Sequence, residues 1–150
     1  MNGNDPLTAI KSAYLDANAV IRFVESEDDG LLFLFEQAAA GLLQLVTSEL
    51  TLAEVLVGPL KDGDQKLAGI YEEFLTSDET LEIRPVDRSV LRRSAEIRAT
   101  LGNKGADAIH IATALLTECS LFFSSDQRLR LPANLKQIEL THIHDTNEWL

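Results

Sequence analysis

Apolar runs alternate with segments of helical spacing along most of the chain. Five short runs rich in branched or aromatic residues predict strands, and they lie at 13–21, 42–48, 81–86, 120–125 and 136–143. Between them, apolar positions three and four residues apart predict helices over 30–40, 48–57, 65–75, 87–101 and 106–117. Parallel strands need crossover connections, which helices supply. The pattern therefore predicts an α/β fold, a mostly parallel five-stranded sheet flanked by helices on both faces.

The length and the few breaks in the pattern predict one domain. A chain of 150 residues with 45% hydrophobic content fits one compact unit with its own core. We expect a single domain over 1–150, in which residues 1–12 form a loose N-terminal extension and 58–66 form a break. No apolar run approaches the ~20 residues of a membrane span, and the start lacks the features of a signal peptide. We therefore expect a cytoplasmic protein without membrane contact.

The charge balance is acidic. The chain has 24 acidic and 13 basic side chains, which give a formal net charge of -11. Such a charge opposes long-range attraction to polyphosphates and argues against a nonspecific nucleic-acid coat. It does not exclude a nuclease, because a carboxylate cluster loaded with divalent cations presents positive charge locally. The charge that matters is therefore that of the site.

Two acids follow predicted strands directly. Asp16 comes after the apolar residues 13–15, and Asp126 comes after 121–123 and two serines. In open sheets of parallel strands, ligands bind outside the carboxyl ends, where the strand order reverses. We expect both carboxylates at that edge of the sheet.

Two further acids stand in apolar helical segments. Asp107 opens the helix in ADAIHIATALL, where the helix dipole alone would stabilise its charge. Glu54 lies among leucines and valines, so its ionised form needs a partner or a cation, and Lys104 would supply a structural ion pair. His110, three residues after Asp107, is either a satisfied core histidine or a hydrogen-bond partner of a carboxylate.

Together the acids predict a metal site. Carboxylates brought close repel one another unless a divalent cation compensates them, and the sequence shows no comparable set of buried basic residues. Oxygen-only ligation favours Mg²⁺ or Mn²⁺ over zinc. The predicted cluster consists of Asp16, Glu54, Asp107 and Asp126. A cation there polarises a phosphate and lowers the pKa of a water, so the natural reaction is phosphodiester hydrolysis.

The four acids also occur in four motifs. They are YLDANAVI, Ser-x-x-Thr-x-x-Glu from Ser48 to Glu54, GADAIHIATAL and FFSSDQRL. In this order the motifs resemble those of PIN-domain ribonucleases, particularly VapC toxins, from about residue 14 to about residue 140. The resemblance implies a three-layer sandwich and a magnesium- or manganese-dependent endoribonuclease that acts on RNA. It also implies a homodimer, held inactive by a small antitoxin protein.

The resemblance assigns roles by position. The metal ligands, or residues that hold metal-bound water, become Asp16, Glu54, Asp107 and Asp126. The supporting groups become Asn18, Ser48 and Ser124, whose hydroxyl and amide groups would orient acids and waters. Ser48 is equally predicted as the N-cap of its helix.

One segment departs from the family pattern. Many relatives carry a further acid after the residue that matches Asp126, whereas this chain continues with Gln127, Arg128, Leu129 and Arg130. This argues against a fifth ligand. The arginines form either a basic rim for substrate phosphates or a solvated surface.

Some different functions are also compatible with parts of the pattern. A haloacid-dehalogenase-type phosphatase likewise begins with a strand that ends in aspartate, but it needs Asp-x-Asp. Asn18 stands at the third position here and cannot act as a general acid. A receiver-like module would bind metal or RNA without cleavage, and a PIN-like scaffold would keep the fold without catalytic activity.

Overall fold

The computed structural model describes residues 10–150. Its centre is a five-stranded sheet in the order β3-β2-β1-β4-β5, and every pair of neighbours is parallel. The strands are β1 (Lys11–Leu15), β2 (Leu43–Ser48), β3 (Leu81–Arg84), β4 (Leu121–Phe123) and β5 (Lys136–Ile138). The α/β prediction is confirmed, with a sheet that is wholly parallel among the described residues.

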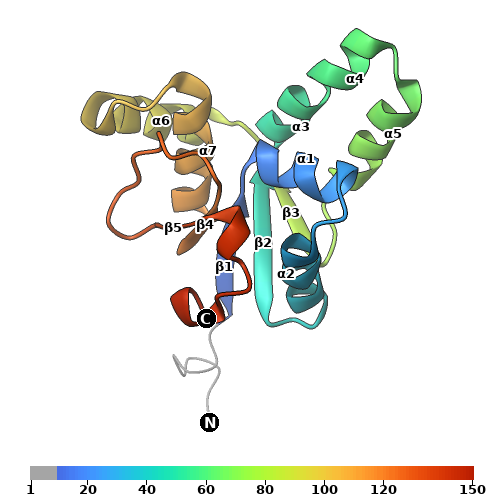
Figure 1. Ribbon diagram of the computed structural model, residues 1–150. Coiled ribbons are helices and arrows are strands. Elements are labelled where there is room, and N and C mark those ends of the chain that lie inside the picture. The colour runs from blue at the N-terminus through green and yellow to red at the C-terminus, as the bar shows by residue number, and fades with distance from the viewer. Residues whose placement is uncertain (1–9) are drawn as a thin grey trace.

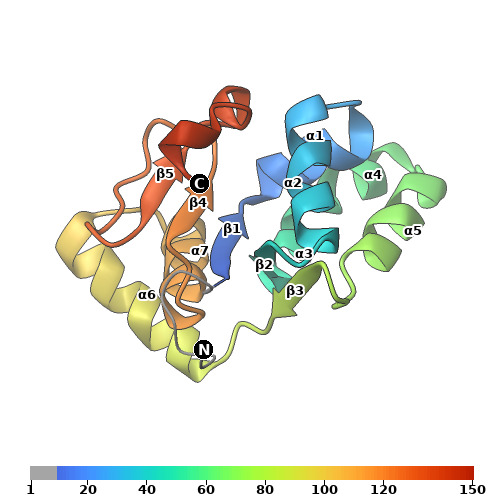
Figure 2. The ribbon, with the colours of Figure 1, turned by 90° about the horizontal axis from the view of Figure 1, so that it is seen from below.

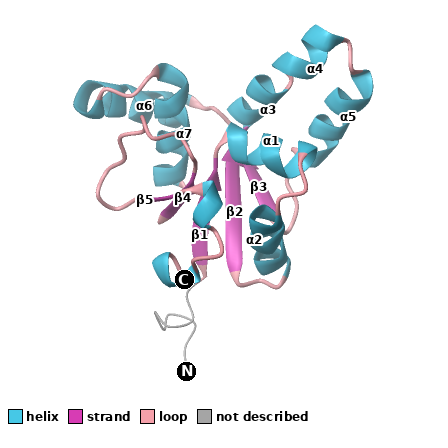
Figure 3. Cartoon of the chain, viewed as in Figure 1, coloured by secondary structure: helices cyan, strands magenta, loops and turns pink. Residues whose placement is uncertain are grey.

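Helices cover both faces of the sheet (Figure 1; Figure 3). The first group is α1 (Ala17–Glu25), α2 (Asp29–Ala39), α3 (Glu49–Val55), α4 (Val57–Asp62) and α5 (Gln65–Phe74). The second group is α6 (Arg88–Leu101) and α7 (Gly105–Leu116). Seen from below, the two groups lie on opposite sides of the strands (Figure 2). None of the described helices combines the length and the apolar character that a membrane crossing requires.

The central strand β1 contributes to both cores. Ala13 and Leu15 pack in the core under the first group of helices, whereas Tyr14 packs in the core under α6 and α7. Successive side chains of a strand point to opposite faces, so a strand covered on both faces is apolar throughout. The end of β1 is therefore held firmly from both sides.

The first strand begins earlier and ends earlier than predicted. It was expected over 13–21, but β1 ends at Leu15 and α1 begins at Ala17. The side chain of Asp16 accepts from the backbone N of Ala19 at 2.8 Å, and this N-cap starts a helix despite the strand-like composition of the segment. β1 also begins at Lys11, so the predicted extension loses its last two residues, and residues 1–9 lie outside the described residues.

Two other boundaries were predicted wrongly. The expected break at 58–66 is largely helical. α4 begins at Val57, tolerates Pro59 in its first turn and ends at Asp62, where Gly63 with its left-handed φ of 69° forms the C-cap; α5 then begins at Gln65. The last strand was expected to run to residue 143, but β5 ends at Ile138 and a 3₁₀ turn, Leu140–His142, follows. Neither change affects the strand ends where the acids were expected.

The strand order reverses beside β1. From β1 the chain proceeds to β2 and β3 on one side, and later returns to β4 and β5 on the other. The crevice outside the carboxyl ends of the strands at such a reversal is where ligands bind in open sheets. The topology therefore points to the ends of β1 and β4.

Candidate active site

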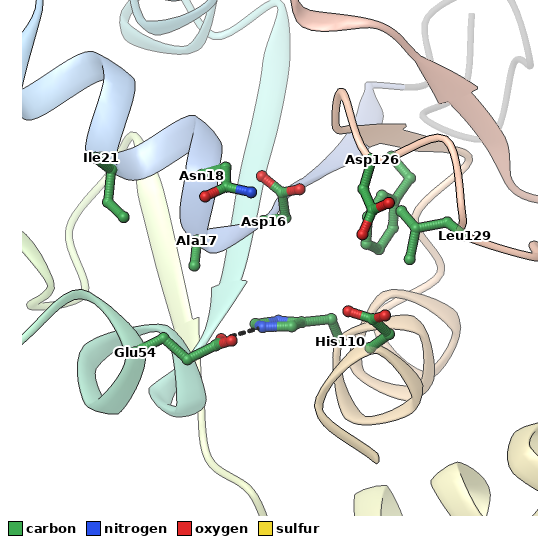
Figure 4. Close-up of a pocket in the computed structure, with 10 residues that line it drawn as sticks. Asp16, Ala17, Asn18, Ile21, Glu54, His110, Asp126 and Leu129 are labelled. Atoms are coloured by element: carbon green, nitrogen blue, oxygen red, sulfur yellow. Dashed lines mark hydrogen bonds and ion pairs between the residues drawn. The ribbon is translucent and has the colours of Figure 1, made fainter. Parts of the chain in front are cut away.

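A pocket of about 270 Å³ lies at the carboxyl ends of β1 and β4. Its lining includes all four acids predicted from the sequence, Asp16, Glu54, Asp107 and Asp126. Figure 4 shows the side chains of Asp16, Glu54 and Asp126 directed into the same space from separate elements. The fold thus brings together side chains that are up to 110 positions apart in sequence.

Asp16 is the most buried of the four acids, with 9% of its surface exposed. Burial raises the pKa of its carboxyl above the usual value, and the negative charge of Asp126 adds to this rise. Hydrogen bonds from the Ser124 hydroxyl and the Ala19 backbone partly offset it. The ionised form is therefore held in place by donors but is short of positive charge.

Asp107 stands in the first turn of α7 and is partly exposed. Burial is again the main cause that raises the pKa of its carboxyl, followed by the charge of Asp126, while His110 and Arg128 lower it. Within residues 10–150, neither Asp107 nor Asp16 forms a salt bridge. A cation bound by them would favour the ionised form of both carboxylates and so offset both shifts.

Glu54 is held by a histidine. The Nε2 atom of His110 lies 2.5 Å from Oε1 of Glu54, and its Nδ1 atom lies 2.5 Å from the hydroxyl of Tyr14. An ionised carboxylate only accepts, so Nε2 carries the proton and, in the neutral ring, Nδ1 accepts from Tyr14. This chain of hydrogen bonds joins α3, α7 and β1, and the dashed line in Figure 4 marks its outer link.

The partner of Glu54 was not predicted. Glu54 pairs with His110 and not with Lys104, and His110, at 4% exposure, supplies the buried basic group that the sequence did not reveal. The two interpretations left open for His110 are both correct, because it is a satisfied core residue that also binds a carboxylate. Its signal in the sequence was its place three residues after Asp107, on the same helix face.

Asp126 has a basic partner of its own. Its two carboxylate oxygens accept from Nε and Nη2 of Arg128 at 3.2 and 3.4 Å, and Oδ1 also accepts from the Arg128 backbone at 2.9 Å. These hydrogen bonds hold the pKa of the Asp126 carboxyl below its usual value. Arg128 therefore contacts the site directly.

The three supporting residues divide into two kinds. Asn18 lines the pocket from the first turn of α1, and buried Ser124, just outside that lining, lowers the pKa of Asp16 and accepts from the Asp126 backbone at 3.0 Å. Ser48 is buried, caps α3 by accepting from Leu50 N at 3.0 Å, and is absent from the pocket lining. Its structural role is confirmed, and a direct role at the site has no support from its contacts.

The donor set fits a hydrated Mg²⁺ or Mn²⁺ ion. Among residues 10–150, the one trio of potential ligands with all ligand atoms within 4.8 Å is His142, Asp145 and Glu148, which are exposed. No three of the four pocket acids therefore have ligand atoms that all lie within 4.8 Å of one another. Mg²⁺ keeps several of its waters and needs only one or two carboxylates, which Asp16 and Asp107 provide without giving up an ion pair.

Comparisons with solved structures give the same fold. VapBC2 from Rickettsia felis, bound to a DNA fragment from its promoter, superimposes with a TM-score of 0.70 at 18% identity over 85% of this chain and 98% of the other. DNA-bound VapBC from Salmonella typhimurium gives 0.70 at 18% identity over 88% and 99%. FitAcB from Neisseria gonorrhoeae gives 0.63 at 21% identity over 87% and 99%.

Sequence comparison assigns the family. No curated protein is similar enough in sequence to be matched to the chain. The sequence model of the PIN domain matches residues 13–135, which span β2, β3, β4 and most of β1, together with all four pocket acids. With most of its length matched, the chain belongs to the PIN-domain family.

Proposed function

We propose that this chain is a divalent-metal-dependent endoribonuclease that hydrolyses RNA phosphodiester bonds. The observation that carries the proposal is the pocket in which Asp16 and Asp107, both with raised pKa values and without ion pairs among the described residues, face two further carboxylates. A site built in this way gains most from a divalent cation. Membership of the PIN family supports nuclease chemistry.

Each acidic residue of the pocket has a separate role in the proposed hydrolysis. A bound Mg²⁺ or Mn²⁺ ion supplies Lewis acidity and lowers the pKa of a water. Asp16 and Asp107 would hold the ion, with Asp16 kept in place by its bond to the start of α1 and its ionised form favoured by the Ser124 hydroxyl. Glu54, fixed through Oε1 by His110, orients the attacking water and accepts its proton. Asp126 completes the negative face that balances the ion.

We also propose that the nuclease is the toxin of a toxin–antitoxin pair. The solved structures with this fold include VapBC assemblies and a toxin–antitoxin complex from Klebsiella pneumoniae, which gives a TM-score of 0.60 at 22% identity. By analogy, a small antitoxin protein binds this chain, and the chain forms a homodimer in the cytoplasm. Growth arrest on expression, relieved by the product of an adjacent small gene, tests this part separately.

The catalytic proposal is tested with purified protein and a panel of structured and single-stranded RNAs. Wild-type protein is incubated with Mg²⁺, with Mn²⁺ or with EDTA, beside Asp16→Asn, which keeps a good N-cap for α1. We expect cleavage only by the wild type with metal. Cleavage by the folded Asp16→Asn variant would show a contaminant and overturn the site assignment. Binding of RNA without cleavage by any sample would favour a silent RNA-binding scaffold.

A further inference from the structure

A second hollow, of about 530 Å³, opens directly from the acid pocket. The two share Asn18, Ile21 and Asp126. Asn18 and Ile21 belong to α1, while Asp126 lies on the loop after β4, so the shared residues mark both sides of the opening (Figure 4). We call this second hollow the arginine groove, and its remaining lining is Arg22, Ser26, Ser125, Arg128 and Leu140.

The arginine groove has two cationic side chains in a strongly acidic chain. Arg22 lies on α1, one turn beyond Asn18, and Arg128 lies on the loop across the opening. The neighbouring hollow beside Phe23 and Leu32 is lined instead by the acidic stretch 27–29. In a protein of net charge -11, a polyanion gains attraction where arginines gather and loses it elsewhere.

Both arginines are held loosely enough to accept another anion. Nη1 of Arg22 lies 3.8 Å from Oδ2 of Asp28, beyond hydrogen-bond range, while Oδ1 of Asp28 caps α2. The Arg128 side chain is 75% exposed in its pair with Asp126. Both arginines reach solvent although their aspartate partners are largely covered. Ion pairs at the surface contribute little, and each guanidinium has five N–H donors in a fork that fits a phosphate.

We infer that the arginine groove binds the phosphodiester backbone of the RNA strand next to the scissile bond, with Arg22 and Arg128 contacting phosphates that are not cleaved. This inference rests on the proposed function. The groove continues the acid pocket, so one strand passes from the metal site to the arginines without leaving the surface. Arg128 thereby forms part of a basic rim that binds the substrate.

Asp126 couples the two sites. The Arg128 guanidinium neutralises part of the Asp126 charge beside the proposed metal site, and a guanidinium that turns to a phosphate leaves that charge free to attract the cation. Removal of the Arg128 charge should therefore weaken the binding of RNA but not the binding of the divalent cation. Arg128→Gln binds RNA more weakly and binds Mn²⁺ as tightly as the wild type or more tightly.

The experiment measures RNA binding apart from cleavage. A fluorescent single-stranded oligoribonucleotide is titrated with full-length Asp107→Asn protein, alone and combined with Arg22→Gln, Arg128→Gln or both. Arg92→Gln, which removes the same charge from an 83% exposed side chain on α6, is the matched control. We expect about fivefold weaker binding per groove arginine, and a salt slope smaller by about 0.7 for each phosphate that is no longer neutralised. The control should bind like the parent.

Three results would overturn the inference. They are an unchanged affinity in the double variant, an equal loss of affinity in the Arg92→Gln control, and weaker Mn²⁺ binding by Arg128→Gln in calorimetry. If wild-type protein cleaves RNA while the double variant binds normally, the groove assignment fails and the nuclease proposal stands. If the wild type neither cleaves nor binds any RNA, both fail together. Thermal melts of each variant confirm that it is folded.

Discussion

The four pocket acids form two pairs with different surroundings. Glu54 and Asp126 each bond to a basic side chain, whereas Asp16 and Asp107 form no salt bridge within residues 10–150. Burial and neighbouring acids raise the pKa of both members of the second pair. The demand for a cation is therefore concentrated on Asp16 and Asp107, which we call the unpaired acids. Glu54 and Asp126, which we call the paired acids, already accept hydrogen bonds from basic side chains.

This difference assigns different tasks to equivalent side chains. Carboxylates that lack a basic partner give a metal ion the largest gain, because the ion removes their repulsion without breaking another bond. Carboxylates with a fixed partner are better suited to orient a water or to tune charge. Proximity to the pocket does not by itself distinguish ligands from orienting groups, but the hydrogen-bond partners do.

The largest expected effect comes from removing the charge of an unpaired acid. Asp107→Asn should lower the rate of RNA cleavage by about 100- to 1000-fold, because loss of a ligand removes several kcal/mol of transition-state stabilisation. Asp126→Asn, which changes a paired acid, should lower the cleavage rate only about tenfold. Single-turnover cleavage at saturating Mn²⁺ measures both. Equal losses in the two variants would contradict the division of the pocket.

A smaller effect is expected from the partner of Glu54. His110→Gln keeps one donor but loses the link from Glu54 to Tyr14, so kcat should fall by about 10- to 100-fold, as for other groups that orient active-site residues. Affinity for Mn²⁺ should change little, because Glu54 is assigned to the water. A large loss of metal affinity with unchanged kcat would instead make Glu54 the principal ligand. His110→Phe should lose more activity than His110→Gln.

Substitution of Ser124 tests the unpaired acid Asp16 without changing its carboxylate. Its hydroxyl lowers the pKa of Asp16, so Ser124→Ala should weaken Mn²⁺ binding by about tenfold, as a hydrogen bond to a charged group is worth about 1.5–3 kcal/mol. Ser48→Ala, which removes the cap of α3 outside the pocket lining, is the matched control. It should lower stability by about 1 kcal/mol without changing Mn²⁺ affinity.

The smallest effect is a pH dependence of stability in the absence of metal. The folded pKa of Asp16 is raised from 3.8, so the folded state binds the proton more tightly than the unfolded state. Stability from this group is present below the unfolded pKa and is lost as pH rises through the folded pKa. Asp16→Asn should therefore gain stability relative to the wild type over that window. Urea denaturation in EDTA at a series of pH values checks this, and a constant difference would contradict it.

The arrangement of the acids was predictable because it follows from topology. Asp16 and Asp126 come directly after apolar strands, and the carboxyl ends of parallel strands meet at one edge. The alternation of strands and helices was sufficient to predict that edge. The helix start at Ala17 was missed because the composition of the segment favours a strand, and only the capping bond of Asp16 decides for the helix.

The partners of the acids were much less predictable. His110 reaches Tyr14 across 96 positions and Glu54 across 56, and no local pattern specifies contacts of that range. Arg128 lies only two residues from Asp126, yet a solvated arginine and one that bonds a carboxylate have the same sequence. The difference between the paired and the unpaired acids could therefore be seen only in the fold.

The central claim is that Asp16 and Asp107 hold the divalent cation. Calorimetric titration of Mn²⁺ into metal-free wild type, Asp16→Asn and Asp126→Asn tests it most directly. We predict binding by the wild type, binding weakened by about 100-fold or more in Asp16→Asn, and binding within about tenfold of the wild type in Asp126→Asn. Wild-type affinity in the folded Asp16→Asn protein would contradict the account.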